Sequence, residues 1–389
     1  MTLEHDAAFP AVADIDLDAI GDNLRLVRST AQTATLGVVK ADAYGHGRQQ
    51  CAQAMMAAGA DYLGVAQLAE ALDLRQEVGP EPRILTWLYA PGAPLGDGLR
   101  ADLEISVGAL WAIDELATAA RKTGITAKVH LKVDTGMARG GIDLWNLAEA
   151  AGKLRAGVAE GLFDVVGLWS HLARADEPEC GLTEQQIDIF EEARHIVDAA
   201  GLDIRIHHLA ASAGALWHPK ARYDMVRPGI VLYGVSPNSG YLSAQQIGLR
   251  AAMTLSAEII AERTVPEGTG ISYGHTDRTD RPTHLGVVPL GYSDGIDRKA
   301  SNVAPLVIDG TRTRIRGRVC MDQFVTELPY GTTVGERAWL FGDAEFGLPT
   351  ADEWADVTGT IGYEIVTRIG ARVPRRYHGT GMASSRAPR

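Results

Sequence analysis

The sequence is poor in cysteine, in basic charge and in long apolar stretches. Its three cysteines, Cys51, Cys180 and Cys320, lack the spacing of a metal motif or a disulfide framework, which is typical of a reducing cytoplasm. With 37 basic and 49 acidic side chains, the net charge of −12 disfavours nucleic-acid binding. No run approaches the ~20 apolar residues that span a bilayer, and residues 1–10 lack the blocks of a secretory signal. We therefore expect a cytoplasmic protein with no metal site and with neither nucleic acid nor membrane as a partner.

The rest of the composition is that of an ordinary globular protein, with 46% hydrophobic and 22% charged residues. A chain of 389 residues favours two domains over one. The first part carries eight short apolar runs, most of them separated by roughly 20 to 35 residues, which is room for a helix and two loops. This alternation predicts an α/β fold, a (β/α)8 TIM-type barrel, over residues 1–245. The runs are residues 36–39, 62–66, 84–88, 103–107, 127–133, 165–170, 204–209 and 225–230.

The pattern changes after Leu249, where apolar stretches separated by turn residues predict strands without intervening helices. We expect a mainly β C-terminal domain over residues 246–389. Its strands are predicted at residues 253–261, 285–290, 306–309, 312–319, 324–328 and 338–341. Two helix starts carry the residue spacing of a capping box, Thr183 with Gln186 and Thr350 with Glu353.

A lysine ends the first apolar run. Residues 36–39 are followed by Lys40 and then by small residues, which predicts a buried strand that delivers a lysine to its C-terminal end. Barrel enzymes keep their chemistry at that end. An apolar site lowers the pKa of a lysine and makes its amine a nucleophile able to form a Schiff base. From spacing alone, a strand-end lysine that extends to water is the commoner explanation.

The loops after the seventh and eighth runs contain the small residues of a phosphate site. Ser212 offers a hydroxyl there, and Gly229 lets backbone amides approach an anion closely. Barrels often bind phosphate at these two loops. Ordinary turn chemistry explains the same residues, but together with Lys40 they point to a phosphorylated aldehyde as cofactor.

The stretch VVKADAYGHG (residues 38–47) resembles the pyridoxal-phosphate lysine motif of bacterial alanine racemases. Later segments are similar to the same family in the same order, so the resemblance covers nearly the whole chain. It implies an isomerase of barrel-plus-β architecture that uses pyridoxal 5'-phosphate. The implied reaction interconverts L- and D-alanine by proton transfer between two bases, and supplies D-alanine for peptidoglycan.

The resemblance also assigns the cofactor contacts. Arg227 would face the pyridine nitrogen, and because arginine keeps its proton, the nitrogen would stay unprotonated and the ring would accept less charge. Side reactions such as transamination would then be suppressed. From the residues alone, Arg227 is as well explained by an ion pair at the barrel rim. The implied phosphate contacts are Tyr44, Ser212, Gly229, Ile230 and Tyr363.

Racemisation requires a base on each face of the substrate Cα. The resemblance implies that Lys40 is one and that Tyr273, in GISYGH (residues 270–275), is the other. Free tyrosine has a pKa of about 10, too high for an efficient base at pH 7. His171, in WSHLA (residues 169–173), resembles the histidine that links this tyrosine to Arg227. A tyrosine in a strand is otherwise most often a core residue.

The implied substrate contacts are Arg139, Tyr292 and the backbone amide of Met321. The resemblance implies a homodimer with shared active sites, in which Tyr273 and Met321 come from the partner subunit. Lys132 matches a lysine that is carbamylated in several relatives, although an unmodified lysine balanced by a carboxylate fits the sequence too. The chain departs from the family at Gly140, where relatives carry a bulkier apolar residue after the arginine.

Three other functions remain open on the residues. A broader amino-acid or serine racemase uses the same scaffold, because hydrophobic pockets discriminate one methylene by only ~1–3 kcal/mol. A non-catalytic pyridoxal-phosphate-binding protein resembles the barrel alone, and the β-rich part with Tyr273 argues against it. A decarboxylase of similar build has an acidic partner for the pyridine nitrogen, where this chain has Arg227.

Overall fold

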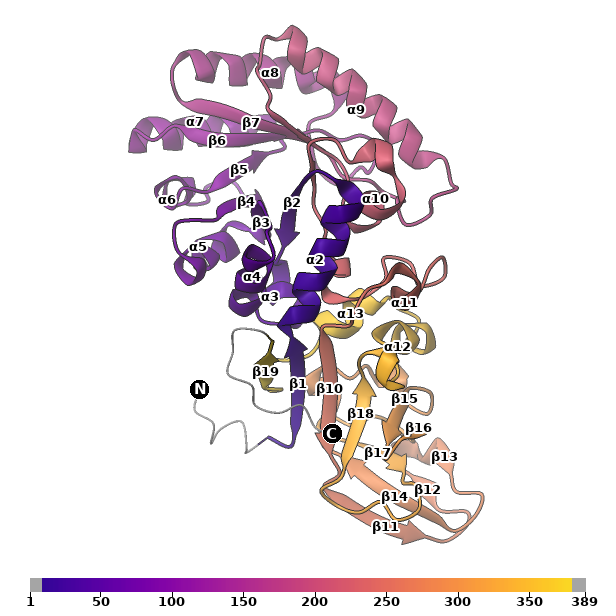
Figure 1. The fold of residues 1–389 in the computed structure, drawn as a ribbon. Coiled ribbons are helices and arrows are strands. Elements are labelled where there is room, and N and C mark those ends of the chain that lie inside the picture. Colours follow the sequence, from indigo (N-terminus) through magenta and orange to yellow (C-terminus); the bar gives the residue numbers. More distant parts are fainter. Residues whose placement is uncertain (1–8, 380–389) are drawn as a thin grey trace. The chain divides into compact units, whose positions relative to one another are not determined.

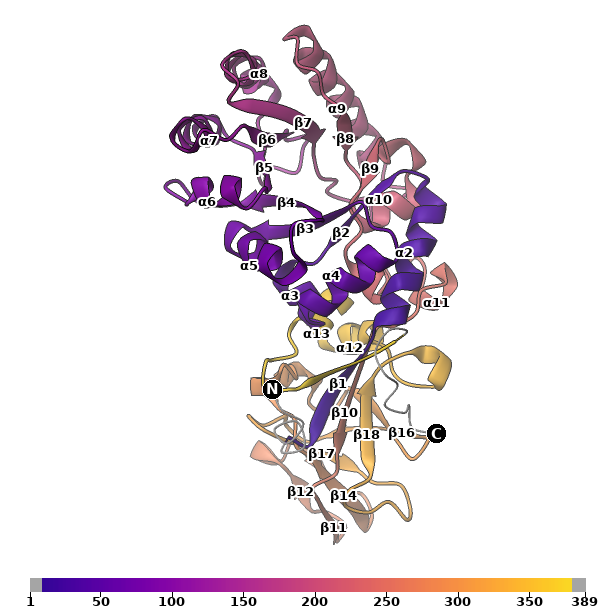
Figure 2. The same cartoon turned by 60° about the vertical axis from the view of Figure 1, so that its left-hand side comes forward.

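The computed structural model describes residues 9–379. It separates into two compact units, labelled by element in Figures 1 and 2. The barrel unit comprises Gly21–Ala43 and Arg48–Leu232, and the β unit comprises the described residues up to Ile20, Tyr44–Gly47 and the chain from Tyr233 onward. The prediction that residues 1–10 are not a secretory signal concerns mainly residues 1–8, which lie outside the described residues.

The barrel unit contains a parallel eight-stranded sheet in the order β8-β7-β6-β5-β4-β3-β2-β9. The Asp224 amide donates to His207 O at 3.0 Å and the Arg227 amide to Ala210 O at 2.9 Å, so the two end strands meet. Each predicted apolar run contains one strand, which confirms the (β/α)8 prediction. The strands are β2 (Ala34–Val38), β3 (Tyr62–Gln67), β4 (Arg83–Leu88), β5 (Glu104–Val107), β6 (Ala127–Lys132), β7 (Phe163–Trp169), β8 (Ile206–His208) and β9 (Met225–Val226).

Amphipathic helices cover the outside of this sheet. In α7, the side chains of Ala112, Ile113, Leu116 and Ala120 are buried at the spacing of one helix face, and the helix ends at Gly124 in the left-handed region. The strands are apolar on both faces because helices cover one and the barrel interior the other. The helices are α2 (Leu17–Ala31), α4 (Arg48–Ala57), α5 (Leu68–Val78), α6 (Leu95–Arg100), α7 (Leu110–Thr123), α8 (Leu144–Ala159), α9 (Leu182–Ala199) and α10 (Ser212–Trp217).

The capping box predicted for α9 is wrong. The N-cap of this helix is Gly181, so Thr183 lies inside the first turn. Gln186 is buried, accepts a hydrogen bond from the Ala173 amide at 2.8 Å and donates one to His171 O at 3.2 Å. The side chain therefore stabilises the loop after β7 instead of the start of its own helix.

The β unit is built on a nine-stranded sheet in the order β11-β14-β17-β16-β15-β18-β10-β1-β19. Each strand predicted after Leu249 is present. The sequence did not predict β1 (Ala11–Asp16), which pairs antiparallel with β10 and parallel with β19. The other strands of this sheet are β10 (Met253–Glu258), β11 (Ala261–Val265), β14 (Thr283–Val288), β15 (Pro305–Ile308), β16 (Thr311–Arg316), β17 (Phe324–Glu327), β18 (Arg337–Phe341) and β19 (Arg375–His378). A separate two-stranded sheet is formed by β12 (Gly270–Ile271) and β13 (Asp277–Arg278).

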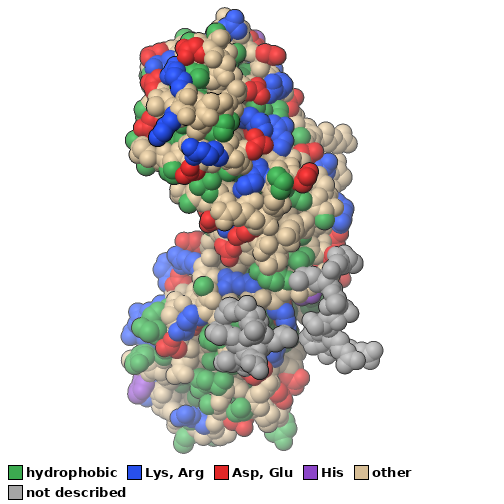
Figure 3. All heavy atoms as spheres, turned by 90° about the vertical axis from the view of Figure 1, so that its left-hand side faces the viewer, with side chains coloured by type: hydrophobic (Ala, Val, Ile, Leu, Met, Phe, Trp, Pro, Cys, Tyr) green, Lys and Arg blue, Asp and Glu red, His purple; other side chains and the backbone are tan. Residues whose placement is uncertain are grey.

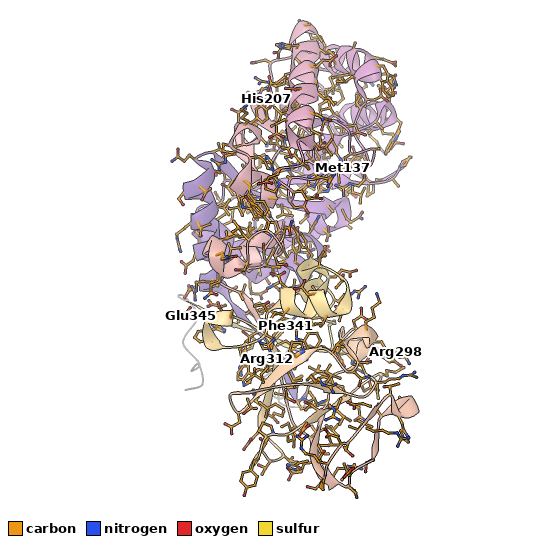
Figure 4. All side chains as sticks on the ribbon, turned by 90° about the vertical axis from the view of Figure 1, so that its right-hand side faces the viewer. Met137, His207, Arg298, Arg312, Phe341 and Glu345 are labelled. Atoms are coloured by element: carbon orange, nitrogen blue, oxygen red, sulfur yellow. The ribbon has the colours of Figure 1, made fainter. Side chains whose placement is uncertain are left out.

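Two helices of the β unit follow β18. In α12 (Ala351–Thr358), Thr350 Oγ1 accepts from the Glu353 amide at 3.1 Å, which confirms the predicted helix start. The Glu353 carboxylate bonds Arg312 of β16, labelled in Figure 4, instead of completing a capping box. The helix α13 (Gly362–Thr367) carries Tyr363.

None of the described helices is long and apolar enough to cross a membrane. Figure 3 shows acidic and basic side chains interspersed over the face in view, with no single basic area. The net charge of the whole sequence, −12, agrees with this distribution.

Candidate active site

The residues after β2 form a left-handed turn. In α3 (Lys40–Gly45), the φ angles of Ala41, Asp42, Ala43 and Tyr44 are 52° to 54°. Each L-residue in this conformation costs roughly 1–2 kcal/mol, and such strain concentrates at functional sites. Polar contacts hold the turn: the Ala41 amide donates to Glu70 Oε1 at 2.7 Å, and the Arg48 amide donates to Asp42 Oδ1 at 2.8 Å. The backbone that carries Lys40 is therefore fixed.

Lys40 lies where the parallel strand β2 ends. Burial lowers the pKa of its amine, and the positive charges of Arg139 and Arg227 lower it further, against an opposing effect of Glu70. An ammonium group loses its hydration on burial, and neighbouring cations repel it. Lys40 therefore supplies a neutral, nucleophilic amine at a lower pH than a solvated lysine does.

Arg227 follows β9 and is only 4% exposed. Its NH2 group donates to Ser170 O at 2.7 Å and to Leu209 O at 3.1 Å, while NH1 donates to His208 Nδ1 at 3.1 Å. Burial lowers its pKa to about 9, which leaves it protonated near neutral pH. Within residues 9–379 no carboxylate pairs with Arg227, so the ion pair considered from the sequence is absent there.

His171 lies beside this guanidinium. Arg227 NH2 has two hydrogens for three acceptors and shares one of them with His171 Nδ1 at 3.3 Å; because arginine only donates, the proton of the neutral imidazole is on Nε2. Burial, followed by the charge of Arg227, lowers the pKa of His171 well below its usual value. The ring is therefore neutral over the physiological range and can accept from Arg227 while donating through Nε2.

Lys132 ends β6, with Nζ 4.9 Å from the centroid of the Trp169 ring. Burial, then the charge of Arg139, lowers its pKa to about 8. Lys132, Arg139 and Arg227 concentrate positive charge at the C-terminal ends of the strands, near Lys40. Such a cluster binds an anionic ligand.

The loop that carries Arg139 is defined by its backbone. Asp134 Oδ1 accepts from the amides of Gly136 and Met137, both at 2.9 Å, and Figure 4 labels Met137. Gly141 has a φ of 127°, and a Cβ there would lie 2.5 Å from the carbonyl carbon of Val133. A glycine is thus required at Gly141, one residue after the position where the chain departs from the family.

The two loops predicted to bind phosphate meet in the barrel unit. The Gly229 amide donates to Ser212 Oγ at 2.9 Å, and Ile230 follows directly in the chain. In the β unit, the rings of Tyr44 and Tyr363 have centroids 6.5 Å apart. Each unit therefore brings two of the predicted phosphate contacts close together, Ser212 and Gly229 in the barrel unit and Tyr44 and Tyr363 in the β unit.

The predicted residues of the β unit share one exposed patch. Tyr273, Tyr292 and Met321 are 70%, 46% and 53% exposed. Their loops are bonded to one segment: Ser272 Oγ donates to Arg318 O at 2.7 Å, and the Tyr292 amide donates to Cys320 O at 3.0 Å. Large apolar and aromatic side chains that are exposed together mark a surface that binds another molecule.

Sequence reasoning did not identify the residues that hold Arg227 and Lys40 in place. The ring of Trp169 lies 4.8 Å from Arg227 Cζ, but the sequence shows this tryptophan only as a neighbour of His171 and shows His208 only within the apolar run 204–209. Glu70 gave no signal, because an acidic residue in the first turn of a helix is common. His130 was visible as a polar residue in the middle of an apolar run, which is the pattern that identifies a polar group inside a barrel.

A (β/α)8 barrel with a partly buried, low-pKa lysine at a strand end, a buried arginine and two small-residue loops is the arrangement of a barrel enzyme. The family descriptions that match are "Alanine racemase, N-terminal domain" over residues 15–237 and "Alanine racemase, C-terminal domain" over residues 252–377. The chain belongs to the alanine racemase family.

Relatives match over nearly their whole length. An alanine racemase of Beutenbergia cavernae is 51% identical over 377 residues, covering 95% of this chain and 98% of the relative. The crystal structure of alanine racemase from D-cycloserine-producing Streptomyces lavendulae superimposes with a TM-score of 0.94 at 45% identity, covering 95% and 97%. That of the Bartonella henselae enzyme, described with covalently bound pyridoxal phosphate, gives 0.84 at 26% identity, covering 95% and 99%.

Proposed function

We propose that this chain interconverts L- and D-alanine with pyridoxal 5'-phosphate, and that Lys40 and Tyr273 are its two bases. Near full-length identity of 51% to a relative named alanine racemase carries the proposal. The product D-alanine would serve peptidoglycan synthesis in the cytoplasm. The boundary between the two domains near residue 245 is part of the same proposal.

The donor set of the barrel unit fits the cofactor. An aldehyde needs an amine that is neutral near physiological pH, and burial lowers the pKa of Lys40. A phosphate needs small residues with hydrogen-bond donors; the Gly229 amide donates to Ser212 Oγ at 2.9 Å, which orients the hydroxyl and leaves its hydrogen for a phosphate oxygen. Arg227 has a second NH1 hydrogen beyond the one bonded to His208, which is available to a ring nitrogen. Ile230, Tyr44 and Tyr363 complete the proposed phosphate contacts by resemblance.

Lys40 is the proposed base on one face of the substrate Cα. When bound, pyridoxal phosphate would acidify the Cα–H bond of the amino acid joined to it. Lys40 Nζ, uncharged at a lower pH than a solvated lysine, can take this proton and return it. The fixed left-handed turn keeps the amine in place for both directions of transfer.

Tyr273 is the proposed base on the other face. Its 70% exposure on the β unit agrees with a role in the active site of a partner subunit, where a second copy of the chain would cover it. We therefore infer a homodimer with shared active sites. His171 would link the tyrosine to Arg227 through its Nε2 hydrogen, since Nδ1 already accepts from the guanidinium.

Arg139, Tyr292 and the amide of Met321 are the proposed contacts of the substrate carboxylate and of the pocket. Lys132 would orient Arg139 after carbamylation, in which the neutral amine adds to CO2 and releases one proton. A pKa of about 8 supports this step, because part of the amine is neutral at physiological pH. Intact mass measured in CO2-retaining buffer would show the added mass, which Lys132→Ala would remove.

A substrate panel tests the proposal. The chain loaded with pyridoxal phosphate is incubated with each L-amino acid, and chiral chromatography follows the D-isomer. We expect alanine to be racemised fastest and serine poorly. Equal or faster turnover of serine would favour the broader racemase, and no turnover of any amino acid would favour a binding protein.

Lys40→Ala is the matched variant. Borohydride reduction followed by peptide mapping should identify the cofactor on Lys40 in the wild-type chain and on no lysine in the variant. An unchanged lysine adduct in Lys40→Ala would contradict the assignment. Lys128→Ala, which removes a partly exposed lysine paired with Asp102 at 2.6 Å, is the control and should leave the adduct unchanged.

A further inference from the structure

A chain of hydrogen bonds crosses the interior of the barrel and ends on Arg227. Arg83 Nε donates to Glu104 Oε1 at 2.6 Å, and Glu104 Oε2 lies 2.7 Å from His130 Nε2. His130 Nδ1 lies 2.9 Å from His208 Nε2, and His208 Nδ1 accepts from Arg227 NH1 at 3.1 Å. Arg83 and Glu104 begin β4 and β5, so the chain runs from the N-terminal ends of the parallel strands toward their C-terminal ends.

The middle of this hydrogen-bond chain is buried. The side chains of Glu104, His130 and His208 are 0–1% exposed, whereas that of Arg83 is 44% exposed. His207, the preceding residue of β8, is labelled in Figure 4 and bonds Asp224 at 3.0 Å. Because side chains alternate along a strand, His208 points into the barrel. The carboxylate and the two imidazoles are therefore inside the barrel core, where an unpaired polar group is costly.

The two ends of this hydrogen-bond chain determine which ring nitrogen of His208 and of His130 carries the proton. Arginine can only donate, so His208 Nδ1 is an acceptor and the ring proton of His208 is on Nε2. That proton is donated to His130 Nδ1, which places the proton of His130 on its Nε2, facing Glu104. The carboxylate can only accept, so the direction agrees at both ends and both imidazoles are neutral. Burial and the charge of Arg227 lower the pKa of His208 well below its usual value, in agreement with this.

The neighbouring backbone leaves room for the contact between the two histidines. A Cβ on Gly167 of β7 would lie 2.2 Å from His130 Nδ1, and the φ angle of this glycine does not itself require glycine. The pairing of β6 with β7 shifts register between Val129 and His130. Trp169 stacks on His208 with ring centroids 5.6 Å apart and planes 2° apart. The glycine at position 167 and the register shift thus leave space for the contact between His130 and His208.

We propose that Glu104 and His130 are positioning residues for Arg227, which act by holding His208 in the single tautomer that accepts from the guanidinium. The role of Arg227 toward the cofactor rests on the proposed function. The tautomers rest on the hydrogen-bond geometry alone.

Solid-state 15N NMR of the holoenzyme with labelled histidine tests the tautomers without substrate. We expect a cross-peak between a protonated and a bare ring nitrogen across the 2.9 Å contact, unchanged from about pH 6 to about pH 9. His130→Asn should remove that cross-peak and so assign it. A charged imidazole at either position, or an Nδ1 proton on either ring, in the wild-type chain would overturn the proposal.

Glu104→Gln tests the role of the carboxylate. An amide cannot accept from both His130 and Arg83, so the variant should populate a second histidine tautomer. We expect kcat to fall about tenfold while KM for alanine changes by less than about twofold. The ring-nitrogen signal of 15N-labelled pyridoxal phosphate should shift as well, which a merely structural role would not cause. Gly167→Ala, which adds a Cβ against His130 without changing any charge, should give the same tautomer change.

Asp164→Asn is the matched control. Asp164 lies in the N-terminal part of β7 and pairs with Arg205 at 2.8 Å, but both side chains are partly exposed and outside the hydrogen-bond chain. This variant should keep the wild-type histidine signals and kcat. Wild-type tautomers and kcat in both Glu104→Gln and Gly167→Ala would overturn the proposal. A wild-type chain that fails to racemise alanine would instead refute the proposed function, and the histidine signals distinguish the two failures.

Discussion

At the scale of residues, burial sets the charge of each group around Lys40. Arg227 stays protonated near neutral pH despite a pKa lowered to about 9, because the intrinsic basicity of a guanidinium is so high. Lys40 and Lys132 start from lower intrinsic pKa values, and the same surroundings lower both, that of Lys132 to about 8. His171 becomes neutral altogether. One environment thus produces a permanent cation, two potentially neutral amines and a neutral imidazole, since each begins from a different reference pKa.

The first prediction concerns Lys132 in carbonate-free buffer. Its folded-state pKa of about 8 lies below that of the unfolded chain, so the folded state releases a proton that the unfolded state keeps between about pH 8 and pH 10.5. The contribution of this lysine to stability is therefore unfavourable below pH 8 and is relieved as the pH rises to 10.5. Lys132→Met should raise the free energy of unfolding at pH 7 by about 1–2 kcal/mol, after discounting for partial exposure.

Urea denaturation at pH 7 and at about pH 10 measures this effect. The gain of Lys132→Met over the wild-type chain should shrink at the higher pH. Lys128→Met, which removes a partly exposed lysine of the same strand, is the control and should show no such gain at pH 7. A Lys132→Met chain less stable than the wild type at both pH values would contradict the prediction.

The second prediction concerns Tyr273. Tyr273→Phe removes only the hydroxyl that would carry the proton and leaves Lys40 intact, so the cofactor should still be trapped on Lys40. Turnover of alanine should fall by at least about a hundredfold, the size of a general acid–base contribution. Racemase assays in both directions, with borohydride trapping on the same sample, measure the two properties separately. Wild-type turnover would exclude Tyr273 as a base.

At the scale of elements, the left-handed turn after β2 is the local structure that the site depends on most. Ala41 has a φ of 52° and an exposed side chain, so glycine would relieve the strain there without losing packing. The entropic cost of glycine offsets part of this gain. We expect Ala41→Gly to change the free energy of unfolding by less than about 0.5 kcal/mol, in either direction. Ala41→Val should destabilise by about 1–2 kcal/mol.

The matched position is Ala156, which is exposed within the right-handed helix α8. Ala156→Gly should lose about 1 kcal/mol in the same denaturation experiment, because glycine only adds entropic cost there. A loss for Ala41→Gly as large as that for Ala156→Gly would mean that the turn is not strained in solution.

The strands of the barrel could be predicted from the sequence because each overlaps a short, mainly apolar run. Lys40 and Ser212 were predicted from their positions after those runs and from the family resemblance, and Arg227, inside the eighth run, from the resemblance. β1 could not be predicted, since its partners β10 and β19 lie more than 230 residues away in sequence and its buried residues include only small alanines and Ile15. Glu104 and His208 were missed because their importance depends on contacts across the barrel.

At the scale of the whole molecule, the exposed patch of Tyr273, Tyr292 and Met321 requires an explanation that one chain does not provide. The patch comes from loops that are hydrogen-bonded to the segment 318–321, so these loops have a defined conformation. Exposed aromatic and apolar groups that are held in place are typical of a surface that another molecule covers. In an isologous dimer the same patch of each copy would serve the other copy.

The last prediction tests this sharing by complementation. The Lys40→Ala chain retains Tyr273, and the Tyr273→Phe chain retains Lys40, so neither homodimer has a complete pair of bases. If sites are shared, a mixed dimer has one site with both bases and one site with neither. Random mixing gives half mixed dimers, so about a quarter of all sites should be intact and about a quarter of wild-type activity should return.

Co-expression of the two chains with different affinity tags, followed by tandem purification, isolates the mixed dimer. Its specific activity should be about half that of the wild-type dimer, whereas each variant purified alone should remain inactive. A mixed dimer confirmed by native mass spectrometry but without activity would place both bases on one chain. The exposed patch would then have to bind a different partner, because a Tyr273 that acts with Lys40 of the same chain does not need a second copy.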